Sequence, residues 1–338
     1  MPDLNTTWFL LVGVLLGGYA VLDGFDLGVG TLHLFVAKSD RERRVLLNAI
    51  GPVWDGNEVW LLTGGGALFA AFPPVYATVF SGLYTALMLL LMALILRAVA
   101  LEFRSKVEGR GWRRAWDVGF AAGSFLPALL FGVALGNVLR GLPLSADGEF
   151  AGTFLGLLNP FALVVGLLSV AMCTMQGAAW LVLKTEGDLK VRAEAACRRA
   201  WGAFLVLWVV ATLLSRGFLP HLWTVFGHGI AWVPPAVFVL AALAVPLALK
   251  RRGLPAFAFS SVAVLALMGI VGEGLYPNLV PALGDPGRSL TIYNASSTAR
   301  TLSTMLAIAL IGMPVVIAYT VFIYRRFRGP VALDEMSY

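Results

Sequence analysis

The chain has 338 residues, of which 59% are hydrophobic and only 13% are charged. Soluble globular proteins carry about 25% charged residues, so this composition excludes an ordinary soluble domain and predicts an all-α polytopic membrane protein. The net charge of +6 would suggest nucleic acid in a soluble protein, but here the basic residues lie between apolar segments, so we expect no nucleic-acid partner and attribute the charge to membrane topology.

Apolar segments long enough to cross a bilayer need about 20 residues. Nine segments meet this length, so we expect nine transmembrane helices in a single membrane domain over 1–338. Pro73-Pro74 and Asn159-Pro160 mark two helix starts, because proline is accepted in the first turn of a helix. The expected spans are 8–36, 46–71, 75–101, 115–139, 159–183, 200–219, 233–249, 255–276 and 300–323.

The distribution of basic residues predicts the orientation of the chain. With the N-terminus outside and the C-terminus cytoplasmic, twenty lysines and arginines fall in the inner loops and the tail 324–338. The outer side keeps only four, which are Arg140, Arg216, Arg288 and Arg300. This asymmetry agrees with the rule that cytoplasmic loops carry the basic excess.

The first span contains two acids, Asp23 and Asp26, which are three residues apart and share one face of a helix. Ionisable residues inside a membrane are costly, so each is a candidate for function. The neighbouring Gly24, Gly28 and Gly30 allow another helix or a cofactor to approach closely, and tight helix packing is the favoured interpretation.

The second span carries the densest polar stretch, GPVWDGNEVWLL, over residues 51–62. Asp55 and Glu58 are again three apart, on one helical face. Counted from the inner ends of the first two spans, Asp26 lies roughly 15 Å deep and Asp55 about 13–15 Å deep. The two acids are therefore expected at similar depth.

The third span adds Arg97 and, beyond it, Glu102 and Lys106, which are four apart in the favourable order for a helical ion pair. Such groups form a ladder of ionisable side chains from the inner surface toward the middle of the membrane, as a proton-uptake path requires. The alternative is a structural cluster of buried ion pairs in which Arg97 neutralises one acid. The ladder consists of Lys106, Glu102, Arg97, Glu58, Asp55 and Asp26.

Haem ligation by this chain is not expected. The three histidines, His33, His221 and His228, lie at the end of a span or in an outer loop, whereas a b-type haem needs an axial ligand such as histidine or methionine. Met88 and Met92 are the remaining candidates, although methionine in a span is usually core filler. The two cysteines have no metal-ligand spacing, so we expect no metal site.

Six segments in order resemble subunit II of cytochrome bd-type quinol oxidases, the large subunit that ligates no haem. They are GFDLGVG, GPVWDGNEVWLLTGGGALFAAFP, RSKVEGRGWRRAWDVGF, GNVLRGLP, LLNPFALVVGLLSVAM and LTIYNASS. The resemblance covers essentially the whole chain. It implies two four-helix bundles plus one peripheral helix, with the first bundle over about 8–139 and the second bundle with the peripheral helix over about 159–323.

The resemblance also implies a function. The complex would oxidise quinol, reduce O₂ to water and take protons from the cytoplasm, in the bacterial cytoplasmic (inner) membrane. The partner, subunit I, would ligate haem b and haem d. Some members hold a structural quinone in this subunit, and small single-span subunits are further partners to consider.

By position, the resemblance puts Trp54 and Asp55 near haem propionates of the partner and on an inner proton route, with Asn57 and Arg97 close by. Glu102 and Lys106 fall on a second proposed route. Glu102 departs from the pattern if the usual acid is aspartate, and Glu58 replaces glutamine in some members.

Two other functions stay open at this point. A proton-coupled secondary transporter would also suit intramembrane acids and glycine-rich spans, although no inverted repeat is evident. A purely structural subunit would leave proton uptake to the partner alone.

Overall fold

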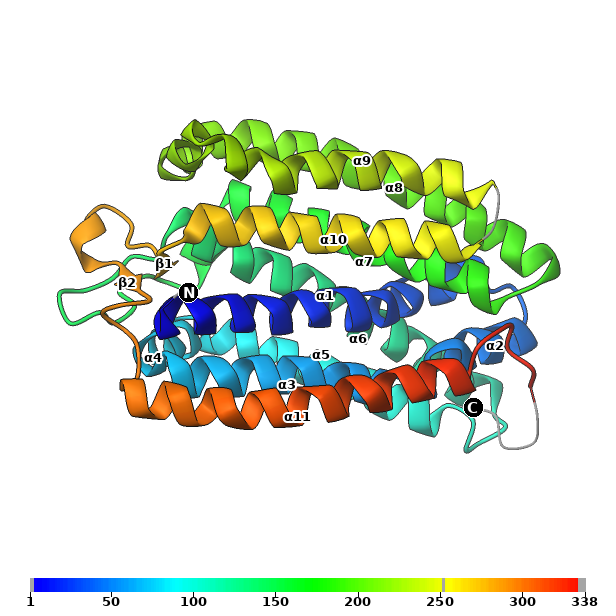
Figure 1. The fold of residues 1–338 in the computed structure, drawn as a ribbon. Coiled ribbons are helices and arrows are strands. Elements are labelled where there is room, and N and C mark those ends of the chain that lie inside the picture. Colours follow the sequence, from blue (N-terminus) through cyan, green and yellow to red (C-terminus); the bar gives the residue numbers. More distant parts are fainter. Residues whose placement is uncertain (1–2, 251–252, 334–338) are drawn as a thin grey trace.

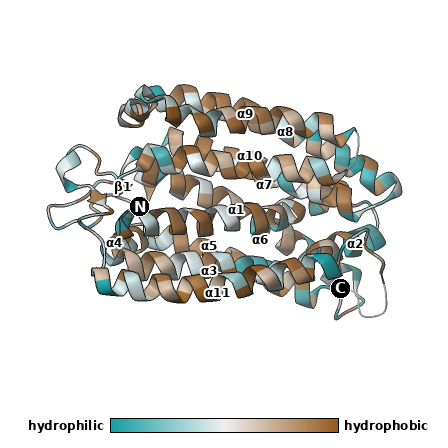
Figure 2. Ribbon diagram, viewed as in Figure 1, coloured by the Kyte–Doolittle hydropathy of each residue, from teal (hydrophilic) through white to brown (hydrophobic). Residues whose placement is uncertain are grey.

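The structure, a computed structural model, describes residues 3–250 and 253–333. It is an all-α membrane protein in which eight helical segments are long and apolar enough to cross a bilayer. The helices run side by side, with hydrophilic residues gathered at the two ends of the molecule and apolar residues along the middle (Figures 1 and 2). The α-helices are α1 Leu4–Val36, α2 Asp40–Ile50, α3 Trp54–Ala71, α4 Pro73–Gly82, α5 Tyr84–Phe103, α6 Arg110–Arg140, α7 Pro160–Lys184, α8 Gly187–Phe218, α9 Val233–Leu249, α10 Gly253–Leu275 and α11 Ala299–Arg326.

The remaining elements are short and lie in the connections. A two-stranded antiparallel sheet pairs β1 with β2 between α10 and α11. These elements are η1 Leu155–Leu157, η2 Pro220–Gly227, η3 Gly229–Trp232, β1 Asn278–Val280, η4 Pro286–Arg288 and β2 Leu290–Thr291.

The expected second span, 46–71, is divided in the structure. The helix α2 ends at Ile50, and α3 begins at Trp54 after a turn that contains Gly51 and Pro52. The helix α3 is 18 residues long and contains the polar residues Asp55, Asn57 and Glu58. These residues lower its hydropathy, so α3 is not among the eight segments that are apolar enough to cross a bilayer. The apolar pattern over 46–71 predicts one continuous helix, but the Gly-Pro pair at 51–52 breaks it.

Two further boundaries differ from the expectation. The third span, 75–101, divides at Leu83 into α4 and α5, and α8 begins at Gly187 rather than near residue 200. By contrast, both proline starts are confirmed: α4 begins at Pro73 and α7 at Pro160. The side chain of Asn159 caps α7 by accepting a hydrogen bond from the N–H of Ala162.

The centre of the molecule is the crossing of α1 with α7. A Cβ built on Gly28 would lie 1.8 Å from the carbonyl oxygen of Cys173, and one on Gly177 would lie 2.4 Å from the carbonyl carbon of Gly28. Only glycine permits backbones to approach this closely. The expected packing role of Gly28 is therefore confirmed, and the crossing fixes the rotation of α1 that brings its acids to the interior.

Candidate functional site

A fully buried ion pair joins α1 to α5. The Nη2 of Arg97 lies 2.6 Å from Oδ1 of Asp23, and its Nη1 lies 3.1 Å from Oδ2, so the guanidinium grips both carboxylate oxygens. Both side chains are 0% exposed. Glu58 of α3, which is partly exposed, approaches the same guanidinium at 3.4 Å. One arginine thus serves two acids from two other helices.

A separate chain of hydrogen bonds joins Asp26, on the same helix as Asp23, to α11. The phenol of Tyr324 donates to Oδ1 of Asn57 over 2.9 Å, and the amide of Asn57 donates to Oδ2 of Asp26 over 2.7 Å. The other oxygen of Asp26 is buried and has no hydrogen-bond partner among the described residues. We call the six residues that make up these contacts the interior cluster: Asp23, Asp26, Asn57, Glu58, Arg97 and Tyr324.

The interior cluster has more acids than bases, since three carboxyl groups surround one guanidinium. Arg97 neutralises Asp23 directly, whereas Asp26 receives only the neutral amide of Asn57. An ionised carboxylate in an apolar interior costs free energy unless a cation or several donors compensate it. The arrangement can therefore hold a proton on a carboxyl group that a single cation does not cover.

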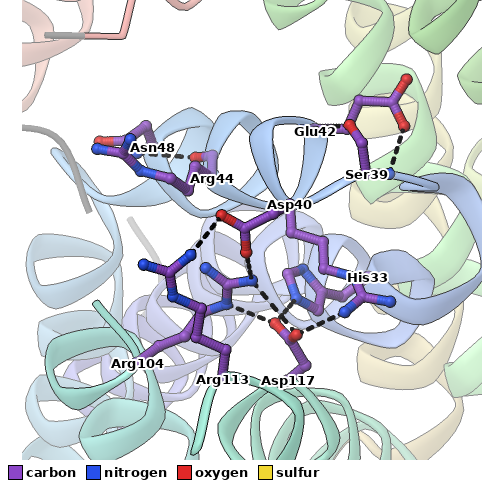
Figure 3. A network of polar contacts seen from close by, with 10 residues as sticks. His33, Ser39, Asp40, Glu42, Arg44, Asn48, Arg104, Arg113 and Asp117 are labelled. Carbon is purple, nitrogen blue, oxygen red and sulfur yellow. Dashed lines mark hydrogen bonds and ion pairs between the residues drawn. The ribbon is translucent and has the colours of Figure 1, made fainter. Parts of the chain in front are cut away.

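A second polar network lies at the end of the molecule where α2 lies (Figure 3). Asp117 of α6 is fully buried and accepts from Nε2 of His33 at 2.6 Å and from Nε of Arg104 at 2.6 Å. Arg43 of α2 adds a contact of 2.8 Å to the other oxygen of Asp117. This network joins α1, α2 and α6 to the segment that follows α5.

Asp40 extends the network to the surface. It accepts from Arg104 over 2.7 Å and from Arg113 over 3.0 Å. Burial lowers the pKa of the Arg104 guanidinium, but its bonds to Asp117 and Asp40 outweigh burial and raise that pKa above its ordinary value. Arg104 therefore stays charged and holds α5, α2 and α6 together at this end.

The sequence does not predict that His33 and Asp117 form a pair. The signal that was available is the segment RSKVEGRGWRRAWDVGF, in which two acids, Glu108 and Asp117, stand among several basic residues near a helix start. Which basic residue meets Asp117 depends on how three helices turn toward one another, and a single sequence does not contain that information.

The structure brings together four of the predicted site residues and leaves the others apart. Asp26, Asn57, Glu58 and Arg97 belong to the interior cluster, whereas Asp55 lies exposed near the start of α3. The side chains of Glu102 and Lys106 are also exposed, and Trp54 is half-buried. The roles predicted for these residues stay predictions.

Two members of the interior cluster were missing from the predicted site. The sequence marks Asp23 as an intramembrane acid, but it does not pair it with Arg97, because 74 positions separate the two residues. Tyr324 was placed in the cytoplasmic tail, whereas α11 continues to Arg326 and brings the phenol to Asn57.

The described histidines lie outside the interior cluster. The Nε2 of His33 is bound to Asp117, and the ring packs edge-on against Phe120 with centroids 5.1 Å apart. His228 is exposed in the connection between α8 and α9, and the side chain of His221 lies outside the described residues. Met88 and Met92 are 42% and 63% exposed on α5, so neither is core filler.

Comparisons with known proteins agree over the whole chain. Residues 4–327 match the family described as cytochrome bd terminal oxidase subunit II. Cytochrome bd-I ubiquinol oxidase subunit 2 of Escherichia coli (strain K12) is 38% identical, with 99% of this chain and 97% of the relative covered. Cytochrome bd ubiquinol oxidase subunit 2 of Bacillus subtilis (strain 168) is 35% identical, with 100% of both chains covered.

A solved structure shares the fold. A chain of the bd oxidase from Geobacillus thermodenitrificans superposes with a TM-score of 0.77 at 19% identity and covers 96% of this chain and 98% of its own length. At 19% identity this structural match shows the fold alone, whereas the sequence matches show the family. The chain belongs to the cytochrome bd terminal oxidase subunit II family.

Proposed function

We propose that this chain pairs with a haem-bearing subunit I in a quinol:oxygen oxidoreductase of the bacterial inner membrane, and that it contributes to proton uptake. Membership of the subunit II family supports the oxidase role, since relatives across the full length are named ubiquinol oxidase subunits. The observation that carries the proton role is the interior cluster, in which the buried Asp26 keeps one oxygen without a hydrogen-bond partner among the described residues.

The chain crosses the membrane nine times in this proposal, with the N-terminus outside. The helix α3 supplies the span that is missing from the eight apolar segments, and it runs beside α1 and α11 (Figure 1). Two four-helix bundles and the peripheral α11 then account for all nine helices. The twenty basic residues of the inner loops and tail support this orientation.

Protons enter from the inner surface and reach the interior cluster. Asp55, Glu102 and Lys106 are exposed, which suits groups that exchange protons with water or with a partner's polar surface. Asp26 and Glu58 are the inner acceptors, and Arg97 pairs with Asp23 beside them. Elementary charges that cross the membrane in this way store about 2.3 kcal/mol each per 100 mV.

Haem b and haem d belong to subunit I in this proposal, and no step of the reaction is assigned to a haem on this chain. Of the three residues predicted to lie near a haem, Trp54 is half-buried, whereas Asn57 and Arg97 are buried. Trp54 is therefore the one that faces the partner. Asn57 and Arg97 act from inside, through Asp26 and Asp23. Quinol and O₂ are substrates of the complex, and a structural quinone and small single-span subunits are further components to be sought in the purified complex.

A purely structural role is the second candidate, favoured by a specific observation. The two-oxygen grip of Arg97 on Asp23 is the geometry of an ion pair that holds helices together. A secondary transporter is disfavoured, because the family match extends over residues 4–327.

Oxygen consumption by the purified complex separates the two candidates. Asp26→Asn and Asp55→Asn are compared with Asp285→Asn, an exposed acid in the loop between β1 and β2. We expect both test variants to lower quinol-dependent oxygen consumption at least about a hundredfold, the lower end of the range for a lost proton-transfer group, while the control does not. The reduced spectrum of the haems must stay unchanged, which shows that the complex is assembled. Wild-type turnover of Asp26→Asn would leave only the structural role.

A further inference from the structure

A pocket of about 440 Å³ opens at the end of the molecule where α11 ends. Its walls come from three places: the turn between α2 and α3, the last turns of α7, and the end of α11 with the residues that follow it. The segment after α11 folds back over the pocket, since the N–H of Val331 donates to the carbonyl of Lys184 over 2.9 Å. The pocket is therefore enclosed by α7, by the turn between α2 and α3 and by the segment that follows α11.

The charge of the pocket is one-sided. Its lining contains three cations, Lys184, Arg326 and Arg328, and no acid among the described residues that line it. Lys184 donates to the carbonyl of Phe327 and lies 4.9 Å from the ring centroid of Trp180, so it is held at the wall. Arg326 and Arg328 are exposed, and neither has an ion-pair partner in the part of the chain that the structure describes.

The neighbouring pocket shows the contrast. It measures about 260 Å³ and shares Lys184, but its lining also contains Glu42, Glu186 and Asp188. These acids offset its cations, so that pocket does not favour an anion. Of these two pockets, the larger one combines a cationic rim with a lining that contains no acid among the described residues.

The uncharged walls of the larger pocket suit an amphiphile. Pro52, Val53 and Phe327 supply apolar surface, and Trp180 and Tyr324 supply rings whose polar atoms are already bonded, to Ala49 and Asn57 respectively. Aromatic rings beside basic residues at the end of membrane helices lie at the depth of lipid headgroups. Basic pockets between transmembrane helices on the cytoplasmic side bind anionic headgroups.

We propose that this pocket binds the phosphate group of an anionic phospholipid of the inner leaflet, with Arg326 and Arg328 as the principal ligands and Lys184 as the third charge. The guanidinium groups suit phosphate, because they offer paired donors in a planar fork. The site is distinct from the interior cluster but is connected to it through Tyr324, whose ring lines the pocket while its hydroxyl bonds to Asn57.

Photolabelling of the intact complex tests the proposal. The purified oxidase is placed in phosphatidylcholine nanodiscs with a photoreactive phosphatidylglycerol or with a photoreactive phosphatidylcholine of the same acyl chain. Labelled peptides are then quantified by mass spectrometry. We expect phosphatidylglycerol to label residues 324–332 more strongly than phosphatidylcholine does.

Two variants assign the label to the basic residues. Arg326→Gln/Arg328→Gln should lower the phosphatidylglycerol label at least about fivefold, the effect of one lost basic residue at a membrane surface. Arg300→Gln is the matched control, because Arg300 is an exposed arginine at the opposite end of the same helix, and it should leave the label unchanged. Equal labelling by the two lipids, or an unchanged label in the double variant, would overturn the proposal.

Inorganic phosphate distinguishes a lipid from a free anion. Phosphatidylglycerol labelling that persists in excess phosphate supports the lipid, which stays in the bilayer at high local concentration. Labelling that phosphate abolishes means that the pocket takes free phosphate, and it would refute the assignment to lipid.

Discussion

Substitution of Arg97 by glutamine should destabilise the protein severely. Arg97 and Asp23 are both 0% exposed, and two contacts of 2.6 Å and 3.1 Å join them. Removing one partner of such a pair leaves a buried carboxylate without its cation, at a cost of about 3–5 kcal/mol. Glu58 also loses its neighbour at 3.4 Å, so we expect the upper half of that range.

The free energy of unfolding of the purified complex, measured by titration with dodecyl sulfate in mixed micelles, is the quantity to compare. Asp23→Asn/Arg97→Gln removes both charges and should recover more than half of the loss, because no isolated charge remains buried. Arg113→Gln is the control, since its pair with Asp40 is 33% and 45% exposed and should contribute no more than about 1 kcal/mol. A loss below about 1 kcal/mol for Arg97→Gln, or a double variant that is less stable than Arg97→Gln, would refute this reasoning.

Three further variants address the packing and the inner network. Asp117→Asn and Glu42→Gln are measured in the same titration, and Gly28→Ala is measured by the yield of assembled complex. Asp117→Asn should cost about 3–5 kcal/mol, because His33, Arg43 and Arg104 would lose the charge that they share; a near-neutral result would show that the network is dispensable. Gly28→Ala should prevent assembly or greatly reduce yield, because its Cβ would lie 1.8 Å from a carbonyl oxygen of α7, whereas Gly13→Ala has open space and should be neutral or stabilising by up to about 1 kcal/mol. Glu42→Gln should flatten the acid sensitivity of the complex. Partial burial raises the pKa of Glu42, but the N–H groups of Lys38 and Ser39 and the guanidinium of Arg192 outweigh it and lower that pKa. Its stabilising effect is therefore full above the ordinary value of 4.5 and is lost as pH falls below it, so a wild type that is no more acid-sensitive than the variant would contradict the assignment.

The sequence determined the class of the protein and the local features. Composition required a membrane protein, and the proline starts placed the first turns of α4 and α7, because both follow from the chemistry of single residues and short segments. The spacing of Asp23 and Asp26 put both acids on one helical face, as the structure has them. Six short segments along the chain were enough to indicate the family.

Only the tertiary structure decided which polar groups meet. The pairing of Asp23 with Arg97 and of Asn57 with Tyr324 joins residues that are 74 and 267 positions apart. It depends on the depth and rotation of each helix, which the close approach of α1 and α7 at Gly28 helps to set. The rise of 1.5 Å per residue gives the depth of a residue along its helix, but not the direction in which its side chain points. That is why Asp55 and Asp26 could be placed at one level while the rotation of α3 put Asn57, and not Asp55, against Asp26.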